Sequence, residues 1–381
     1  MKFRTSAPAV LISAVIVIIA TISIVSNFIS HRMAASFEDG QFALMGKIMH
    51  SKLLGAEGKA ITAAETIAAM PAVKKAFSSG NRDELFAVTK DAFRVQHEKY
   101  GVSQAQFHLA PAVSFLRVHN PEKFGDDQAR FRQMIVEVNR ANAIRKGIEI
   151  TTSGIGIFGT LPLTNAQGSV IGSFETGMEF GPVLDELKKA YGFELALFID
   201  EKALRETATS LKSDIFSEKN RVSSYVKFYA THAELMQTLV GDGDITITED
   251  AHYLRETGGV PHGVLLQPVY NYAKKQIGVV AMAANFSNTR SADGQAVAWQ
   301  TLLGLLSAVL LIGIILIVIR GMLLRPMEVL NERVQALASG EEPRELPGAD
   351  AWCDEMRDLV DGCERLAKGP AGDKATGEDA S

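Results

Sequence analysis

Two long stretches of this chain contain no charged residue, and they limit what it can fold into more than any other feature. Residues 7–29 read APAVLISAVIVIIATISIVSNFI, and residues 297–319 read VAWQTLLGLLSAVLLIGIILIVI. The hydrocarbon core of a bilayer is about 30 Å thick and is crossed by roughly 20 apolar helical residues. Each stretch is long enough, so the sequence predicts two transmembrane helices.

Each stretch has one alternative interpretation. Residues 7–29 could be a cleavable signal peptide, but the apolar part of such a peptide is only about 7–15 residues long. Residues 297–319 could be a buried core helix, although a globular protein's helix normally carries a polar face and this one has none. We therefore expect both stretches to remain in the membrane.

The flanking cations predict the orientation of the chain. They are Lys2, Arg4, Arg320, Arg325 and Arg333. Because cytoplasmic flanks carry the excess of Lys and Arg, residues 1–6 and the chain after residue 319 are expected in the cytoplasm. Residues 33–295 would then lie outside the inner membrane of a bacterial cell, in the periplasm.

Composition excludes several classes of function. The 381 residues carry a net charge of −5 and no long run of Lys or Arg, which argues against nucleic acid as a partner because phosphate binding needs a basic patch. The two cysteines, Cys353 and Cys363, are ten apart with no CxxC and no His partner. They are expected to be reduced packing residues rather than a metal site.

The region between the two stretches begins with helices. Apolar residues recur at helical spacing from Met33 to about Tyr100. The segment Met70–Val73 contains Pro71, which disfavours helix in the residue before it. A shorter helix is expected to begin at Asn81, a residue type that caps helix N-termini.

From Ala105 the apolar residues alternate, which indicates strands. A helix is expected over about 127–142, with an Asp as its N-cap, and a turn at Asn165–Gly168. The pattern predicts an antiparallel sheet with helices beside it.

A second unit follows with a similar pattern. We expect a strand over 193–199, a helix within about 225–240, and a hairpin of 263–269 with 276–282. The segment Leu161-Pro162…Ile171-Gly172 is echoed by Gln267-Pro268…Ile277-Gly278. This weak internal repeat predicts two stacked copies of one fold.

Three segments resemble the double Cache sensory domain of bacterial chemoreceptors and sensor kinases. They read SFLRVHNPEKFGDDQARFRQMIVEVNRAN at 114–142, GIEI…GIGIFGTLPL at 147–163 and SVIGSFETG at 169–177. The resemblance extends over roughly Met33 to Ser291 and implies an α+β fold. That fold has a long N-terminal helix and two stacked PAS-like antiparallel-sheet modules, a distal one at about 105–190 and a proximal one at about 191–290.

The sequence departs from the family pattern at one position. The family favours Arg where this chain has Phe158. The resemblance therefore implies one cation fewer near the ligand pocket.

Residues 320–368 resemble a HAMP linker, the helical bundle that receives motion from transmembrane helices. Two helices are expected, and their apolar residues step 3, 4, 3 as in a coiled coil. These residues are Met327, Leu330, Val334 and Leu337, then Met356, Leu359, Cys363 and Leu366. Two helices cannot bury both seams alone, which predicts a homodimeric four-helix bundle; the alternative is a plain amphipathic tail. Residues 341–349 would connect the helices, and residues 369–381 are expected to be disordered.

A polar cluster in the distal module is the candidate ligand site. Arg117 and His119 are two residues apart on an expected strand, and His108 is expected to face them from the neighbouring strand. Arginine matches a carboxylate with two parallel hydrogen bonds, and Phe115 would supply an apolar wall on the same face. We expect a small anionic or amphiphilic ligand. The alternative is a structural ion pair of Arg117 with Asp126 or Asp127.

Other chemistry is not favoured. Asp126 and Asp127 could bind a cation, but helix capping, which needs no cation, is the favoured interpretation. The motif Gly154-x-Gly156-x-x-Gly159 has the glycines of a dinucleotide loop, but no helix is expected after it to receive a phosphate. No nucleophile or metal motif stands out, so neither a cofactor nor an enzymatic activity is predicted.

These features together predict a transmembrane sensor. A small ligand would bind outside the membrane, and the signal would pass through the HAMP-like bundle to a cytoplasmic partner, since the chain carries no kinase, cyclase or methyl-accepting domain. Two rival interpretations are a truncated or accessory subunit of a full-length receptor and a membrane-anchored periplasmic enzyme.

Overall fold

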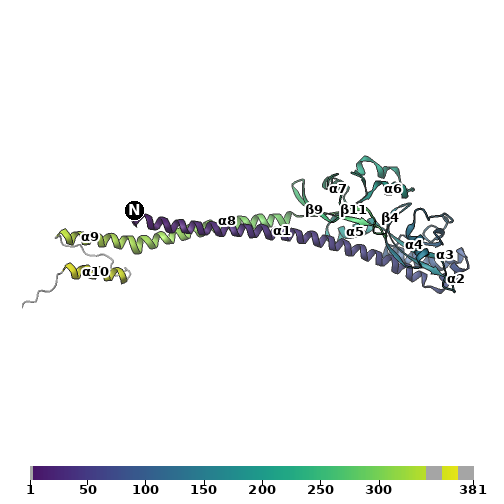
Figure 1. Ribbon diagram of the computed structural model, residues 1–381, viewed down its shortest axis with the longest axis horizontal. Helices are drawn as coiled ribbons and strands as arrows, with labels where there is room; N and C mark the ends of the chain where they lie inside the picture. The colour runs from purple at the N-terminus through teal and green to yellow at the C-terminus, as the bar shows by residue number, and fades with distance from the viewer. Residues whose placement is uncertain (1–2, 340–353, 368–381) are drawn as a thin grey trace, which may run out of the picture. The chain divides into compact units, whose positions relative to one another are not determined.

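The computed structural model describes residues 3–339 and 354–367. One compact unit consists of Ala35–Arg290, and the other combines the chain before it with the chain after it. The predicted connector at 341–349, Cys353 and the tail at 369–381 lie outside the described residues. Figure 1 shows the helices and strands in chain order.

The second unit is helical. It contains the start of α1 (Phe3–Ala68) and most of α8 (Ser287–Val318), followed by the π-helical turn η3 (Ile319–Leu324), α9 (Arg325–Ser339) and α10 (Asp354–Ala367). Two helices in the described part of the chain are long and apolar enough to cross a bilayer, with mean hydropathies of 2.8 and 3.2 over their most apolar windows. They contain the two predicted spans.

The outer faces of these helices are apolar. Val17, Trp299 and Ile317 are 63%, 63% and 74% exposed, as expected for side chains that face lipid rather than a protein core. In the last two helices Met356 is buried, whereas Met327 and Leu359 are exposed. Both helices have the predicted positions, while their assembly into a bundle stays a prediction.

The helical start of the sensor unit follows the predicted pattern. Helix α1 ends at Ala68, and α2 (Pro71–Ser78) begins with Pro71 at its first position, where the missing N–H costs nothing. Helix α3 (Arg82–Tyr100) is capped by Asn81, whose side chain accepts a hydrogen bond from the Glu84 N–H at 3.1 Å.

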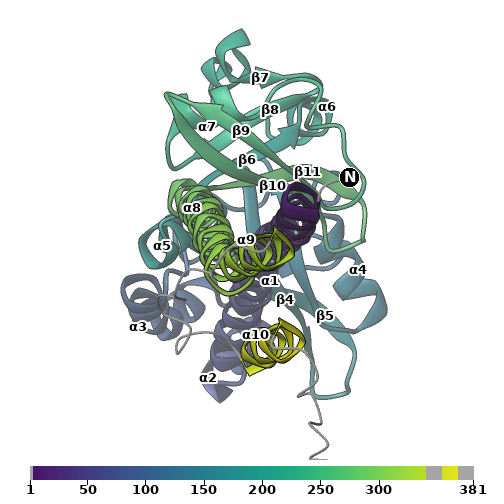
Figure 2. The ribbon, with the colours of Figure 1, turned by 90° about the vertical axis from the view of Figure 1, so that its left-hand side faces the viewer.

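The first sheet, which we call the distal sheet, has five antiparallel strands in the order β2-β1-β5-β4-β3. The strands are β1 (Gln104–Leu109), β2 (Val113–Arg117), β3 (Arg145–Thr151), β4 (Gly154–Thr164) and β5 (Val170–Glu179). Helices α1 and α2 pack on one face, where Phe107 and Phe174 are buried. Helix α4 (Gln133–Ala141) covers the other face, as Figure 2 shows.

The second sheet, the proximal sheet, has six strands in the order β7-β8-β6-β11-β10-β9. They are β6 (Glu194–Asp200), β7 (Arg221–Val222), β8 (Tyr225–Ala230), β9 (Ala251–Thr257), β10 (Val260–Tyr270) and β11 (Gln276–Asn285). Helices and 3-10 turns between the strands are α5 (Phe180–Tyr191), α6 (Glu201–Thr207), η1 (Ser213–Phe216), η2 (Glu218–Asn220) and α7 (Ala233–Leu239).

The prediction of a helix within 225–240 was only half right. Strand β8 takes the first part, and α7 is confined to the second. Tyr225 and Val226 favour a strand by residue type, and pairing with β6 gives the strand a buried side.

The internal repeat is confirmed by strand register. Leu163 pairs with Gly172 in the distal sheet, and Val269 pairs with Gly278 in the proximal sheet. A Cβ on Gly172 would overlap the carbonyl oxygen of His108, and a Cβ on Gly278 would overlap that of Phe198. The two glycines therefore have the same structural role, which is to allow the neighbouring strand to approach closely.

Helix α1 packs on both sheets. One apolar core contains α1 side chains together with strands of the distal and the proximal sheet. The closest approach is at Gly159 of β4, where a Cβ would overlap the backbone of Ile61. Beside it the Thr176 hydroxyl donates a hydrogen bond to the Ala60 carbonyl at 2.5 Å. The distal sheet is thus in direct contact with the helix that leads to the N-terminal span. A movement of the sheet would act on that helix directly.

Candidate ligand-binding site

A β-bulge decides which residues of β2 face the candidate site. Leu116 pairs with Phe107, but Ser114 is the next residue to pair, with His108. Phe115 is the extra residue and turns to the α1–α2 side, where its ring meets the Phe77 ring edge-on at 5.6 Å. The prediction that Phe115 shares a face with Arg117 is therefore wrong, because a bulge interrupts the alternation on which it rested.

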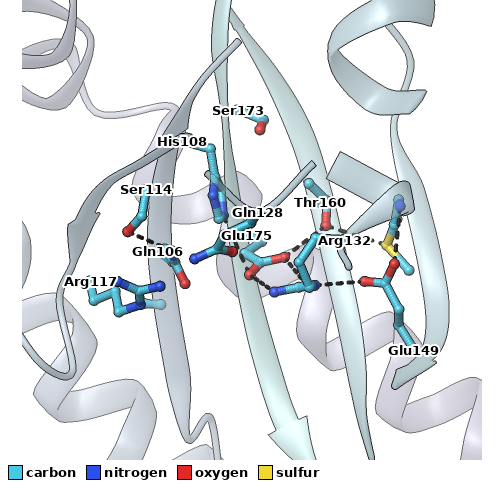
Figure 3. Close-up of polar contacts among 12 residues, drawn as sticks. Gln106, His108, Ser114, Arg117, Gln128, Arg132, Glu149, Thr160, Ser173 and Glu175 are labelled. Atoms are coloured by element: carbon cyan, nitrogen blue, oxygen red, sulfur yellow. Dashed lines mark hydrogen bonds and ion pairs between the residues drawn. The ribbon is translucent and has the colours of Figure 1, made fainter. Parts of the chain in front are cut away.

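The predicted cluster is only partly assembled. Arg117 is the last residue of β2, and His119 lies beyond the strand, with its Nδ1 accepting the Ala105 N–H at 3.2 Å. His108 is fully buried on the α4 side of β1. Arg117 and His119 line one cavity, and His108 is not among its lining residues. Figure 3 shows His108 beside Gln106 and Ser114.

Arg117 forms the ion pair that was the alternative to ligand binding. Its Nη1 and Nη2 donate to the two carboxylate oxygens of Asp126, each at 2.7 Å, and Nη1 also donates to the Lys123 carbonyl at 2.8 Å. The hydrogen bonds from Arg117 hold the pKa of Asp126 well below its ordinary value. The Asp126 side chain is 43% exposed and that of Arg117 only 10%.

Neither aspartate caps a helix, and the predicted helix start near residue 127 is wrong. Asp127 accepts the Ala129 N–H at 2.9 Å in a local turn, and its backbone bridges to Val113. Helix α4 begins only at Gln133. A free backbone N–H of its first turn finds its acceptor on another element, because Glu149 of β3 accepts the Met134 N–H at 3.0 Å.

The cavity that Arg117 lines has a volume of about 370 Å³ and a largely polar wall. Side chains that can hydrogen-bond a ligand there include Gln106, Arg117, His119, Lys123, Gln128 and Arg132. Lys123 forms no ion pair among the described residues. A small polar molecule would fit this space and find several donors.

A buried ion triad at the inner wall was missed by sequence reasoning. Arg132 donates from Nε to Glu149 at 2.9 Å and from Nη1 and Nη2 to the two oxygens of Glu175 at 2.9 and 2.6 Å. Figure 3 shows Arg132 between the two carboxylates, with Thr160 beside it. The available signal was a Glu in the apolar segments of both β3 and β5, since a buried carboxylate needs a cation.

The two carboxylates of the triad differ in their proton affinity. Burial alone would raise the pKa of Glu175, but the charge of Arg132 overcomes it, and the pKa is lowered to about 2. Burial raises the pKa of Glu149 more than Arg132 lowers it. Glu175 is therefore the permanent partner of Arg132, and Glu149 is the carboxylate that takes up a proton more readily.

His108 and Asn139 leave polar atoms unused next to the triad. The His108 Nε2 lies 3.4 Å from a Glu175 oxygen, but the geometry is not that of a hydrogen bond, and neither ring nitrogen has a hydrogen-bond partner among the described residues. Burial lowers the pKa of His108, so its neutral form is favoured. The Asn139 Oδ1 is also buried without a partner. Buried polar atoms of this kind are normally satisfied.

Phe158 occupies the position where the family pattern favours Arg. Its ring is buried, and the Arg132 guanidinium lies 4.6 Å from the ring centroid. The cation of the inner wall thus comes from the segment before α4 and stacks on Phe158. Among the described residues, no group of three or more His, Cys, Asp or Glu side chains could hold a metal ion.

Comparison with known proteins places most of the sensor unit in one family. Residues 52–285 match a family described as the double sensory domain of two-component sensor kinases. No curated protein matches the chain.

Several solved structures are similar to this chain at low identity and low TM-score. An extracellular ligand binding receptor from Desulfohalobium retbaense is 11% identical with a TM-score of 0.37, over 64% of this chain and 39% of that one. A Campylobacter jejuni chemoreceptor ligand-binding domain in complex with 4-methylisoleucine is 12% identical with a TM-score of 0.40, over 67% and 93%. A Vibrio cholerae histidine kinase sensor domain is 9% identical with a TM-score of 0.37, over 64% and 98%.

Proposed function

Because the chain belongs to the double Cache family of sensory domains, we propose that it is a transmembrane sensor of a small ligand outside the inner membrane. The ligand binds in the distal module, and the resulting change passes through the membrane helices to a cytoplasmic partner. The observation that carries the proposal is the polar cavity of about 370 Å³ beside Arg117.

The ligand in this proposal is a small anion or amphiphile whose carboxylate competes with Asp126 for Arg117. The competition is feasible because Asp126 is half-exposed while Arg117 is largely buried, so the carboxylate can swing out and leave the guanidinium in place. The ligand then gains two parallel charge-assisted hydrogen bonds. His119, Gln106 and the exposed ammonium of Lys123 supply further donors.

The signal in this proposal is a shift between two arrangements of the sensor unit. A ligand can move that equilibrium only by its difference in affinity for the two arrangements. Releasing Asp126 frees the segment that precedes α4, and β4 and β5 carry any sheet movement to α1 through Gly159 and Thr176. The chain also continues from β11 into α8 with only Phe286 between them. Both ends of the sensor unit thus lead into candidate spans.

The cytoplasmic step is a homodimeric HAMP-like bundle of α9 and α10. Met327, Val334 and Leu359 are exposed in the single chain, and a parallel partner would cover them by coiled-coil packing. A bundle with two packings would turn a shift of the spans into a signal for a cytoplasmic partner.

Ligand binding can be tested on residues 33–295, which include the compact unit with its own cores. A thermal-shift screen of metabolites identifies a ligand, and calorimetry then compares variants. We expect Arg117→Ala to weaken binding at least tenfold. Arg145→Ala is the matched control, because Arg145 is ion-paired with Glu137 in the same module but outside the cavity. Equal affinities for wild type and Arg117→Ala would disprove the assignment.

A further inference from the structure

Lys227 is a buried cation without a carboxylate partner. The residue is 7% exposed on β8, and its Nζ donates to the Gln237 side-chain oxygen at 2.7 Å and to the Ala233 carbonyl at 3.4 Å. Within the described part of the chain no carboxylate oxygen lies within 4.0 Å of this nitrogen. Arg132 and Arg117, the buried cations of the distal module, each have carboxylate partners.

The surroundings of Lys227 make its lone charge more costly. Burial lowers the pKa of Lys227, and the charge of Lys219 lowers it further. Lys212 lines the same space, and the one acidic side chain there is the exposed Asp214. Burying an ammonium that has only neutral acceptors costs free energy unless an anion balances its charge. The cluster therefore favours an anion.

Lys227 lines a cavity of about 580 Å³. Its wall combines donors with apolar side chains, namely Leu211, Lys212, Ile215, Asn220, Lys227 and Phe228. The single buried charge and the apolar remainder suit a monoanion with a short apolar body. A second negative charge on the ligand would face Asp214.

Strand register shows that Lys227 occupies a position equivalent to one at the distal site. Ser114 of β2 pairs with His108, and Lys227 of β8 pairs with Phe198. His108 and Phe198 are equivalent, because their carbonyls meet the repeat glycines of the two sheets. Both strand pairs also contain a bulge that skips a phenylalanine, Phe115 or Phe228. Lys227 thus lies on the face of the proximal sheet that corresponds to the cavity face of the distal sheet.

We propose that the proximal module holds a second ligand site, for a small monocarboxylate. The carboxylate binds the Lys227 ammonium, with Asn220 and Lys212 as further donors, and the apolar end lies against Ile215. Ser210 lines both this cavity and the one beside Arg117, but the proposed cation is a different one, so the proposal stands or falls independently of the proposed distal ligand.

The test uses the full chain in neutral maltoside micelles and the straight-chain carboxylates from acetate to pentanoate, titrated by calorimetry at pH 7. We expect saturable binding that tightens about threefold to fourfold with each methylene, since each buried methylene is favourable. Lys227→Met should weaken binding at least tenfold, and Lys227→Arg should keep it within a few-fold. Lys202→Met, an exposed lysine of α6 outside the cavity, is the matched control.

Two further measurements can disprove the proposal even if Lys227→Met does not fold. On the wild type, affinity measured from pH 7 to pH 10 should fall as the pH rises, because burial lowers the pKa of Lys227 and the neutral amine no longer attracts a carboxylate. Arg117→Ala, which removes the proposed distal site, should still bind these carboxylates saturably. The proposal is overturned by absence of saturable binding, by affinity independent of pH over this range, or by loss of all saturable binding in Arg117→Ala.

Discussion

The distal and proximal modules share one strand arrangement but treat buried charge in opposite ways. In the distal module Arg132 is enclosed by Glu149 and Glu175, and Arg117 is held by Asp126. In the proximal module Lys227 has only neutral acceptors. The proximal strand position that matches His108 is the apolar Phe198. The repeated backbone therefore fixes where a cavity forms, while a few side chains on β2, β5 and β8 decide its charge.

The comparison also explains how one fold can carry two kinds of site. A paired cation such as Arg117 must give up its internal partner before it binds a ligand, so binding is coupled to a structural change. An unpaired cation such as Lys227 has no partner to release, so binding adds stability without that coupling. We therefore propose that the conformational signal arises in the distal module.

The largest predicted contrast lies between the two buried cations. Replacing Arg132 by Met should destabilise the sensor unit by about 3–5 kcal/mol, because two buried carboxylates lose their counter-charge. Lys227→Met should change stability by less than about 1 kcal/mol, since it removes an unpaired charge. Urea unfolding of residues 33–295 at pH 7 measures both. Equal losses would remove the distinction between the modules.

The packing of α1 should differ between the two sheets. Gly159→Ala places a methyl group against the backbone of Ile61 and should cost roughly 2–3 kcal/mol. Gly46→Ala, where α1 meets the proximal sheet, meets the flexible amide of Gln267 at 3.1 Å. Its cost should be within about 1 kcal/mol, because alanine also favours the helix by about that amount. Thermal unfolding of both variants would show whether α1 is fixed mainly by the distal sheet.

Acid should weaken the distal module through His108. Its folded-state pKa is lowered by burial, so the unfolded chain takes up the proton first as pH falls below about 6.5. Stability should then fall by up to about 1.4 kcal/mol per pH unit, down to the folded-state pKa.

The control for this pH dependence comes from the other sheet. His108→Gln should lose that part of the slope, whereas Phe198→Leu, at the equivalent proximal position, should lower stability equally at all pH values. Urea unfolding from pH 8 to pH 5 tests the pair. A slope that survives in His108→Gln would assign the acid sensitivity to another group.

The smallest expected effects on stability concern the two half-exposed ion pairs. Asp126→Asn and Asp244→Asn break pairs with Arg117 and Arg255, and each should cost about 1 kcal/mol or less. Ligand binding should separate them. Asp126→Asn frees Arg117 and should tighten binding of an anionic distal ligand several-fold, while Asp244→Asn should leave it unchanged. Calorimetry on residues 33–295 measures the ligand affinity of both variants. Weaker binding by Asp126→Asn would show that Asp126 contacts the ligand itself.

The features that local chemistry determines could be predicted from the sequence. The breaks at Pro71 and Asn81 follow from the missing N–H of proline and the capping amide of asparagine. The repeated Ile-Gly strands could be predicted from sequence because both glycines are required by the same close approach of a neighbouring strand. The two spans follow from length and hydropathy alone.

The features it missed depend on contacts between distant segments. The bulge at Phe115 is set by pairing of β2 with β1, and nothing in the residues nearby marks it. The late start of α4 depends on Glu149, a residue of β3 that caps it. Arg132 was passed over because its two carboxylates come from strands far along the chain. The site predicted from sequence thus contained Arg117 and His119 but not the triad behind them.

The central claim is that the sensor unit lies outside the cytoplasm between two spans, and cysteine labelling tests it most directly. A Lys202→Cys chain with Cys353→Ser and Cys363→Ser carries one thiol, on an exposed position of α6. We predict that a membrane-impermeant maleimide labels this thiol in intact spheroplasts and fails to label it in inside-out vesicles. Labelling only in inside-out vesicles, or after lysis, would contradict the account.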